Sequence, residues 1–200
     1  MFPHFFGGFG RRFVSLIAAS AVAATAVVAT APAASADNLN RTSEQVVAQI
    51  EAEAWPYYVR GDRSVDIAAA RKLLAHHGYR SDSTTSRFFN LSLENTVKRY
   101  QRDNPNDLVE TGALDEETWL LLRERTFGEY GPGTRGLVVE AIQVLLKEKG
   151  IASGLAVDGQ YGPATERAVR AAQREFGIGV DGITGRLTFR ALVTYQVAAQ

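Results

Sequence analysis

Two Asp-Gly turns, each followed by an amphipathic run, make up most of the segment from Val157 to Leu192. The run after Asp158-Gly159 repeats its small and apolar residues at helical spacing, at Thr165, Ala168, Val169, Ala172 and Phe176. Pro163 just inside this run and Gly177 just past it are typical of the two ends of a helix. The pattern therefore predicts a helix that begins near Pro163 and ends before Gly177.

Weaker helical stripes lie on both sides of this helix. The run after Asp181-Gly182 carries Leu187, Ala191, Leu192 and Tyr195. An upstream run ends at Gly150 and carries Val138, Ala141, Ile142 and Leu145. We therefore expect three short helices joined by two Asp-Gly loops, which is an all-α module.

The same residues resemble a known bacterial module. In chain order they read Gly133, Leu145-Leu146, Gly150, Asp158-Gly159-Gln160-Tyr161-Gly162, Thr165, Ala168-Val169, Gln173, Gly177, Asp181-Gly182-Ile183-Thr184-Gly185, Thr188 and Leu192. This pattern resembles the peptidoglycan-binding domain that is usually appended to a bacterial amidase, peptidase or muramidase. The resemblance implies a three-helix fold and a ligand in the cell wall.

An internal repeat extends the resemblance over most of the chain. One constant shift along the sequence pairs Gly61 with Gly133, Leu73-Leu74 with Leu145-Leu146, Gly78 with Gly150, and Gln101-Arg102 with Gln173-Arg174. Further along, a slightly shorter shift pairs Gly112 with Gly182, Thr118 with Thr188, and Leu122 with Leu192. The difference falls in the polar loop 103–111, where insertions are tolerated. Residues 55–126 are therefore expected to be a diverged copy of the module.

The first copy keeps the helical pattern but has different loop residues. Ser86-Arg87 stands where the second copy has Asp158-Gly159, and Phe89-Asn90 stands where it has Tyr161-Gly162. Asn90 and Asp115 are residue types that favour the start of a helix. We expect a structural copy whose ligand site is lost or changed.

The first 36 residues have the pattern of a secretory signal peptide. Arg11 and Arg12 precede an uncharged stretch rich in Ala and Val, and Ala34-Ser35-Ala36 is a small-residue cleavage site before Asp37. An uncleaved membrane anchor is the alternative, because the apolar stretch is nearly long enough to span a bilayer. After cleavage, no membrane partner is expected.

The rest of the chain divides into four parts. Residues 37–54 are a polar start and a short helix, expected at Ser43–Ala54 with Thr42 and Gln45 at the spacing of a capping box. The first module is 55–126, a glycine-rich linker is 127–136, and the second module is 137–200. The expected fold is thus all-α, with two tandem three-helix modules behind a short helix.

Composition and residue types exclude several functional classes. The absence of cysteine removes thiol catalysis, thiolate metal sites and disulfides. Without Arg11 and Arg12, 20 basic residues remain against 22 acidic ones, which gives no bulk attraction for nucleic acid. His76 and His77 are adjacent, so on a helix they point about 100° apart and cannot jointly hold a metal. No cofactor, metal or catalytic residue is expected.

Ligand contacts are expected at the Asp-Gly loops of the second module, from Asp158, Gln160, Tyr161, Asp181 and Arg186. A tyrosine can stack on a sugar, an arginine can bind a carboxylate through two hydrogen bonds, and an aspartate can pair with an ammonium group. Compact packing of the helices would bring the two loops to one end of the module. Alternatively, the aspartates are ordinary turn residues, Tyr161 is a packed ring and Arg186 is a solvated charge.

Similar alternatives apply to Trp55, Tyr57 and Tyr58, which either anchor the core or form a sugar-stacking face. Together these observations predict a secreted, cell-wall-associated protein that binds peptidoglycan, through its glycan or its stem peptide, without catalysis. Three alternatives remain open: an inhibitor or targeting subunit for a separate cell-wall hydrolase, a structural module without a ligand, and a small hydrolase that uses a carboxylate pair such as Asp158 and Asp181.

Overall fold

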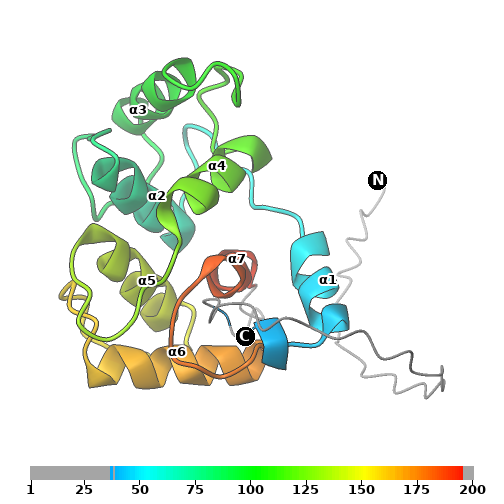
Figure 1. Cartoon of the computed structure of the whole chain (residues 1–200). Coiled ribbons are helices and arrows are strands. Elements are labelled where there is room, and N and C mark those ends of the chain that lie inside the picture. Colours follow the sequence, from blue (N-terminus) through cyan, green and yellow to red (C-terminus); the bar gives the residue numbers. More distant parts are fainter. Residues whose placement is uncertain (1–36, 38, 196–200) are drawn as a thin grey trace, which may run out of the picture. The chain divides into compact units, whose positions relative to one another are not determined.

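The computed structural model describes residue 37 and residues 39–195, and every regular element among them is a helix (Figure 1). A 3-10 helix, η1 (Leu39–Arg41), precedes seven α-helices: α1 (Glu44–Ala52), α2 (Val65–His76), α3 (Leu91–Arg102), α4 (Glu116–Thr126), α5 (Leu137–Glu148), α6 (Pro163–Phe176) and α7 (Arg186–Thr194). This confirms the predicted all-α fold. None of these helices is long and apolar enough to cross a membrane. The expected signal peptide lies outside the described residues.

All described residues belong to one compact unit of the chain, within Ala33–Gln200. Within that unit the two repeats, α2–α4 and α5–α7, are built alike. Four isolated β-bridges join their loops and form two equivalent pairs. Tyr58–Leu114 corresponds to Tyr130–Thr184, and Arg63–Phe88 corresponds to Arg135–Gln160. Both correspondences follow the two shifts found in the sequence, so the predicted repeat is confirmed in the backbone.

The two repeats start their helices differently. In the first repeat a side chain caps each helix, because Ser64, Asn90 and Asp115 accept hydrogen bonds from the first backbone N–H groups of α2, α3 and α4. The caps predicted at Asn90 and Asp115 are therefore confirmed. The equivalent residues of the second repeat are Gly136, Gly162 and Gly185, which have no side chain for this purpose.

Asp37 supplies the cap that α7 lacks. Its Oδ1 atom accepts hydrogen bonds from the N–H groups of Gly185 (3.1 Å) and Thr188 (2.8 Å), and its Oδ2 atom accepts one from Leu187 (2.8 Å). The Thr188 N–H is the counterpart of the one that Asp115 binds in the first repeat. Burial raises the pKa of the Asp37 carboxyl group, although these hydrogen bonds lower it.

We expect Asp37→Ala to lower the free energy of unfolding by about 1–2 kcal/mol, the usual effect of losing a helix cap. The measurement is thermal or urea unfolding of residues 37–200. Asn40→Ala, at an exposed position of η1, is the matched control and should change stability by less than about 0.5 kcal/mol. Equal stabilities of the two variants would show that the Asp37 cap contributes nothing.

Helix α1 lies against α7 (Figure 1). Ile50 packs against Ile178, Leu187 and Ala191 in a small apolar cluster. The guanidinium group of Arg190 donates hydrogen bonds to three backbone carbonyls at the end of α1, at 2.7 to 2.8 Å. The N-terminal segment with α1 thus packs on the second repeat, and we call this segment the strap.

The start of α1 differs from the predicted one. The helix begins at Glu44, and Ser43 is its cap, accepting a hydrogen bond from the Val46 N–H at 3.3 Å. The hydroxyl group of Thr42, expected in a capping box, instead donates to the Asp37 carbonyl and accepts from the Gly179 N–H. Because Thr42 binds the second repeat, the cap moves one residue along the chain.

Helices α2 and α5, the first helices of the two repeats, pack side by side (Figure 1). All residues of α2 from Asp66 to Ala75 are buried, because one face packs on its own repeat and the other on α5. Small residues such as Ala68 and Ala69 allow this close approach. Buried residues of both repeats therefore belong to one apolar cluster.

Ion pairs reinforce this interface between the repeats. Asp66 Oδ1 lies 2.9 Å from Lys149 Nζ, and both side chains are almost fully buried. Lys72 Nζ lies 2.5 Å from Glu140 Oε2. Both pairs join a residue of the first repeat to one of the second, so the repeats form one folded body.

The segments before and after the first repeat carry aromatic side chains, some buried and one exposed. Trp55 is 6% exposed and stacks on Trp119, with ring centroids 5.9 Å apart, so it anchors the core. Tyr57 is 64% exposed. In segment 127–136, expected as a linker, Phe127 is 1% exposed and stacks on Phe189 at 4.0 Å. Phe127, at the start of this segment, thus packs on α7 of the second repeat.

Candidate functional site

The Asp-Gly loop before α7 is held by one buried glutamine, Gln173. Its Oε1 atom accepts hydrogen bonds from the N–H groups of Asp181 (3.1 Å) and Gly182 (2.8 Å). Its Nε2 atom donates to Asp181 Oδ1 (2.7 Å) and to the Ile183 carbonyl (3.0 Å). Gly182 has φ 75°, and a Cβ atom there would collide with two side chains of α6. Asp181 thus supplies an acceptor for the amide of Gln173, and Gly182 supplies the backbone conformation of the turn.

Two further loops are held in the same way. Gln143 Oε1 accepts hydrogen bonds from the N–H groups of Asp158 (3.0 Å) and Gly159 (2.8 Å), and its Nε2 atom donates to Asp158 Oδ1 (2.9 Å). In the first repeat, Gln101 binds the turn 111–112 with the same set of bonds, and a threonine hydroxyl replaces the aspartate. We call these three arrangements the glutamine clamps.

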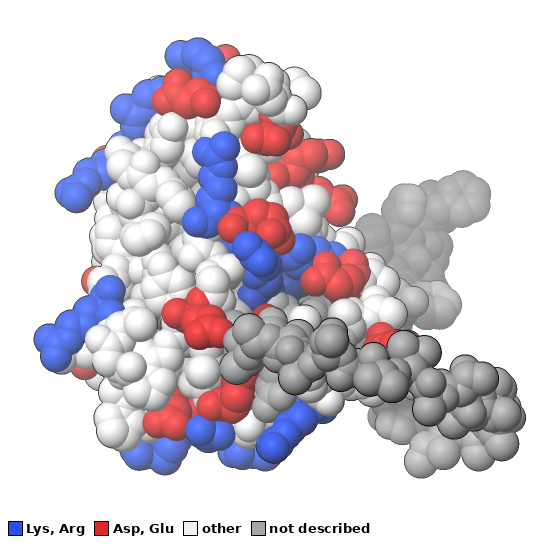
Figure 2. Space-filling view, viewed as in Figure 1, with Lys and Arg blue, Asp and Glu red and all other residues white. Residues whose placement is uncertain are grey.

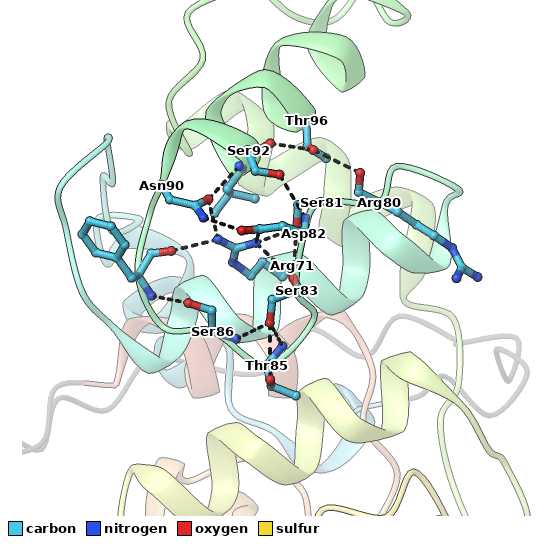
Figure 3. A network of polar contacts seen from close by, with 12 residues as sticks. Arg71, Arg80, Ser81, Asp82, Ser83, Thr85, Ser86, Asn90, Ser92 and Thr96 are labelled. Atoms are coloured by element: carbon cyan, nitrogen blue, oxygen red, sulfur yellow. Dashed lines mark hydrogen bonds and ion pairs between the residues drawn. The ribbon is translucent and has the colours of Figure 1, made fainter.

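An arginine occupies the fourth equivalent position. Arg71, the counterpart of Gln143, is 1% exposed and lies at the centre of the network in Figure 3. Its guanidinium group donates to Ser81 Oγ, Asp82 Oδ1 and Asn90 Oδ1, and to the carbonyls of Ser83 and Phe88. The loop before α3 is therefore held by a cation in place of an amide.

Tyr161 joins the two clamped loops of the second repeat. Its hydroxyl group donates to the Gly182 carbonyl at 2.9 Å and lies 3.3 Å from Thr184 Oγ1. The two loops therefore lie close together, as compact packing of the helices required. The ring is only 2% exposed, and burial raises the pKa of its hydroxyl group.

The structure thus corrects the expectation that Tyr161 stacks on a sugar. A sugar needs an open aromatic face, and this ring has none because it is packed in the apolar core. Its role is to hold the Asp158-Gly159 and Asp181-Gly182 loops together. This agrees with the alternative that Tyr161 is a packed ring.

The other predicted contact residues differ in exposure. Asp158, Gln160 and Arg186 are exposed, and Asp181 is half-buried. The Gln160 N–H donates to Asp158 Oδ1, and this bond, together with the one from Gln143, lowers the pKa of the Asp158 carboxyl group. Both aspartates therefore serve their own turns, and Asp158 also presents a carboxylate at the surface.

Arg186 lies where the strap and both repeats meet. Its Nε atom is 2.9 Å from Glu124 Oε2 of α4, so the charge is paired across the repeats. The groove that it lines also contains Glu51, Arg123 and Glu129, and has a volume of about 390 Å³. In the space-filling view, basic and acidic side chains alternate across the middle of the visible face (Figure 2).

The hydrogen bonds that lower the pKa of Asp158 suit the ionised carboxylate of a glycosidase pair rather than its general acid, whose pKa is raised. Among the described residues, no group of three or more His, Asp or Glu side chains could hold a metal ion.

His77 lies at the end of α2, where burial, His76 and Arg125 lower the pKa of its imidazole. The Nε2 atom of His77 lies 2.8 Å from Thr126 Oγ1 at the end of α4. His77 thus joins the end of α2 to the end of α4.

The fold is that of a helical repeat protein, with two tandem three-helix modules whose turns are held by the clamps. Comparison with known protein families identifies the family. The chain belongs to the family described as "Putative peptidoglycan binding domain", whose model matches residues 63–122 and 135–192.

Two curated relatives share this region. The chain is similar to N-acetylmuramoyl-L-alanine amidase CwlM of Mycobacterium tuberculosis, at 31% identity over 149 residues, which cover 66% of this chain and 36% of the relative. It is also similar to a zinc D-Ala-D-Ala carboxypeptidase of Streptomyces albus G, at 36% identity over 90 residues, 44% of this chain and 32% of the relative. The chain thus spans about a third of the length of these relatives.

The internal repeat pairs Gln101 with Gln173, but the sequence did not indicate that these residues hold loops, and it did not indicate Gln143 at all. Gln143, Gln173 and Gln101 each lie on the helix that precedes the turn they hold. A buried polar residue on the apolar face of each of these helices was the available signal. Asp37 gave no comparable signal, because it is far from Gly185 in the sequence.

Proposed function

We propose that this protein is exported, associates with the bacterial cell wall and binds peptidoglycan without catalysis. The observation that carries the proposal is the match of two tandem copies of the peptidoglycan binding domain family to most of the described chain. The leader pattern of residues 1–36 supports export. The names of both relatives, an amidase and a D-Ala-D-Ala carboxypeptidase, support an association with wall material.

Within the second repeat, the exposed contact residues are Asp158, Gln160 and Arg186. The Gln143 clamp holds the backbone of the loop that carries Asp158 and Gln160, so this backbone loses little conformational entropy when a ligand binds. A carboxylate and an amide suit the amide-rich stem peptide, and a guanidinium group suits its terminal carboxylate. Hydrogen bonds of Asp181 and Tyr161 hold the loops that form this surface.

A second candidate function is supported by the lengths of the relatives. Both are longer proteins named for hydrolytic activities, and this chain matches only about a third of each. A protein that carries the shared part can act as a targeting subunit for a separate cell-wall hydrolase. Capture of such an enzyme by the immobilised protein, without binding to purified walls, would favour this candidate over the first.

The loop surface is tested with Asp158→Asn/Gln160→Ala/Arg186→Ala. Asparagine keeps the Oδ1 acceptor that the Gln143 clamp requires, so the fold should survive. We expect this variant to bind purified sacculi about tenfold more weakly than the unchanged protein. The control, Glu44→Gln/Arg167→Ala, makes the same net charge change at exposed helix positions and should bind normally.

The outcomes separate the candidates. Unchanged binding by the loop variant would remove these residues from the site. Release of dye from labelled walls by the unchanged protein, abolished by Asp158→Asn, would contradict the non-catalytic proposal and favour a carboxylate-dependent hydrolase.

A further inference from the structure

The first repeat has a basic groove of its own, remote in sequence from the clamped loops of the second. It lies between α3 and the loop that follows α2, and it has a volume of about 640 Å³. Its polar lining comes from Arg80, Ser92, Asn95, Thr96, Lys98, Arg99 and Arg102. None of the residues that line it is acidic. Figure 2 shows several basic side chains over α3, at the upper left of the molecule.

Two of the four cations have no acidic partner in the described part of the chain. Lys98 Nζ lies 2.7 Å from Glu94 Oε1, and Arg102 Nη2 lies 2.9 Å from Glu110 Oε1, so these charges are paired. Arg80 and Arg99 form no ion pair with any acid among residues 37 and 39–195. The groove therefore carries two unpaired guanidinium groups on an otherwise nearly neutral protein.

The groove is built by specific hydrogen bonds. The backbone carbonyl of Arg80 accepts one bond from Thr96 Oγ1 (3.3 Å) and another from Arg99 Nη2 (3.1 Å). These bonds fix the base of the Arg80 side chain on α3. In Figure 3 the Arg80 carbonyl faces Thr96, while its guanidinium group extends away from the network. Arg71, which binds Ser81 and the following residues, holds the rest of this loop.

The second repeat lacks this arrangement. In the alignment that pairs Gly61 with Gly133, the counterparts of Arg80, Ser92, Thr96 and Arg99 are all alanine: Ala152, Ala164, Ala168 and Ala171. The same three-helix scaffold therefore exists with and without these side chains. The helix packing does not require them, and neither unpaired guanidinium group forms an ion pair within the described chain. A role toward an external ligand accounts for both observations.

We propose that this groove binds an oxyanion of the cell wall, a carboxylate or a phosphodiester, between the guanidinium groups of Arg80 and Arg99. Guanidinium groups bind either oxyanion through paired, charge-assisted hydrogen bonds, and Asn95 and Ser92 can donate further ones. The first repeat is thus a second binding module with a chemistry different from that of the second repeat. The inference rests on the proposed wall association for the source of its ligand.

The test uses Arg80→Ala/Arg99→Ala in residues 37–200. Alanine is the residue that the second repeat has at both positions, so the variant should fold, and thermal unfolding checks this. The control is Arg167→Ala/Arg174→Ala, which removes the same charge from exposed positions of α6. Binding is measured by co-sedimentation with two wall preparations, complete walls and walls stripped of phosphodiester polymers by hydrofluoric acid.

We expect the groove variant to bind complete walls about tenfold more weakly than the unchanged protein, and the control to bind normally. If the unchanged protein binds stripped walls as weakly as the groove variant binds complete walls, the ligand is a phosphodiester. If the groove variant still binds stripped walls more weakly than the unchanged protein does, the ligand is a carboxylate. If the groove variant binds like the control, the inference is overturned while wall binding stands. If the unchanged protein binds neither preparation, both proposals fall.

Discussion

Replacing Asp66 by valine is expected to lower the free energy of unfolding by about 3 kcal/mol or more, because it leaves the ammonium group of Lys149 buried and unpaired. The two side chains are 6% and 4% exposed, and their charged atoms are 2.9 Å apart across the α2–α5 interface. Burial already lowers the pKa of Lys149, while Asp66 raises it. Valine is the residue at the equivalent position of the second repeat, Val138, so its shape suits the scaffold.

The measurement is urea unfolding of a double-mutant cycle with Asp66→Val, Lys149→Met and their combination. Because each single variant leaves one charge without its partner, the double variant should lose about 1–3 kcal/mol less than the sum of the single losses. Lys149 Nζ also donates to the carbonyls of Val193 and Tyr195, so stability should not return fully. Strictly additive losses would mean that the pair does not couple the repeats.

Gln173→Ala should lower the free energy of unfolding by about 3 kcal/mol, because it leaves several buried polar groups without partners. Two backbone N–H groups lose their acceptor, the Ile183 carbonyl loses its donor, and Asp181 Oδ1 keeps only the Ile183 N–H. Gln173→Glu should be similarly costly, because a carboxylate would face Asp181 where the amide donates. Thermal unfolding of both variants measures the effect.

Gln160→Ala is the matched control for the clamp. Gln160 belongs to the same repeat but its side chain is exposed, so the change should cost less than about 0.5 kcal/mol. A small loss in Gln173→Ala, comparable to that of the control, would show that water replaces the clamp and that the loop does not depend on it.

Local order could be predicted well from the sequence. The ends of α6 follow from Pro163 and Gly177, and the starts of α3 and α4 follow from Asn90 and Asp115, because these residues act through bonds to their own neighbours. The internal repeat is also present in the structure, since both repeats form the same β-bridges.

Contacts between distant segments could not be predicted in this way. Helix α2 is rich in alanine, and its weak stripe does not show that both of its faces are buried. The cap from Asp37 to α7 joins residues far apart in the sequence, and so does the Asp66–Lys149 pair. Periodicity indicates which residues face inwards but not which helix they meet.

The candidate site could likewise be predicted only in part, because it depends on contacts between distant segments. Asp158 and Asp181 were correctly placed in neighbouring loops, yet a turn residue and a ligand contact have the same sequence pattern. Tyr161 is buried because its hydroxyl group finds a partner in the other loop, which no local pattern shows. The basic groove depends on the lack of acidic partners for Arg80 and Arg99 within the described chain, and pairing is visible only in three dimensions.

Binding of residues 37–200 to purified, protein-free sacculi tests the central claim most directly. Co-sedimentation over a range of protein and salt concentrations should show saturable binding that persists at moderate ionic strength, with no release of labelled wall fragments. A protein that stays in solution under all these conditions would contradict the account, and the family would then describe the fold alone.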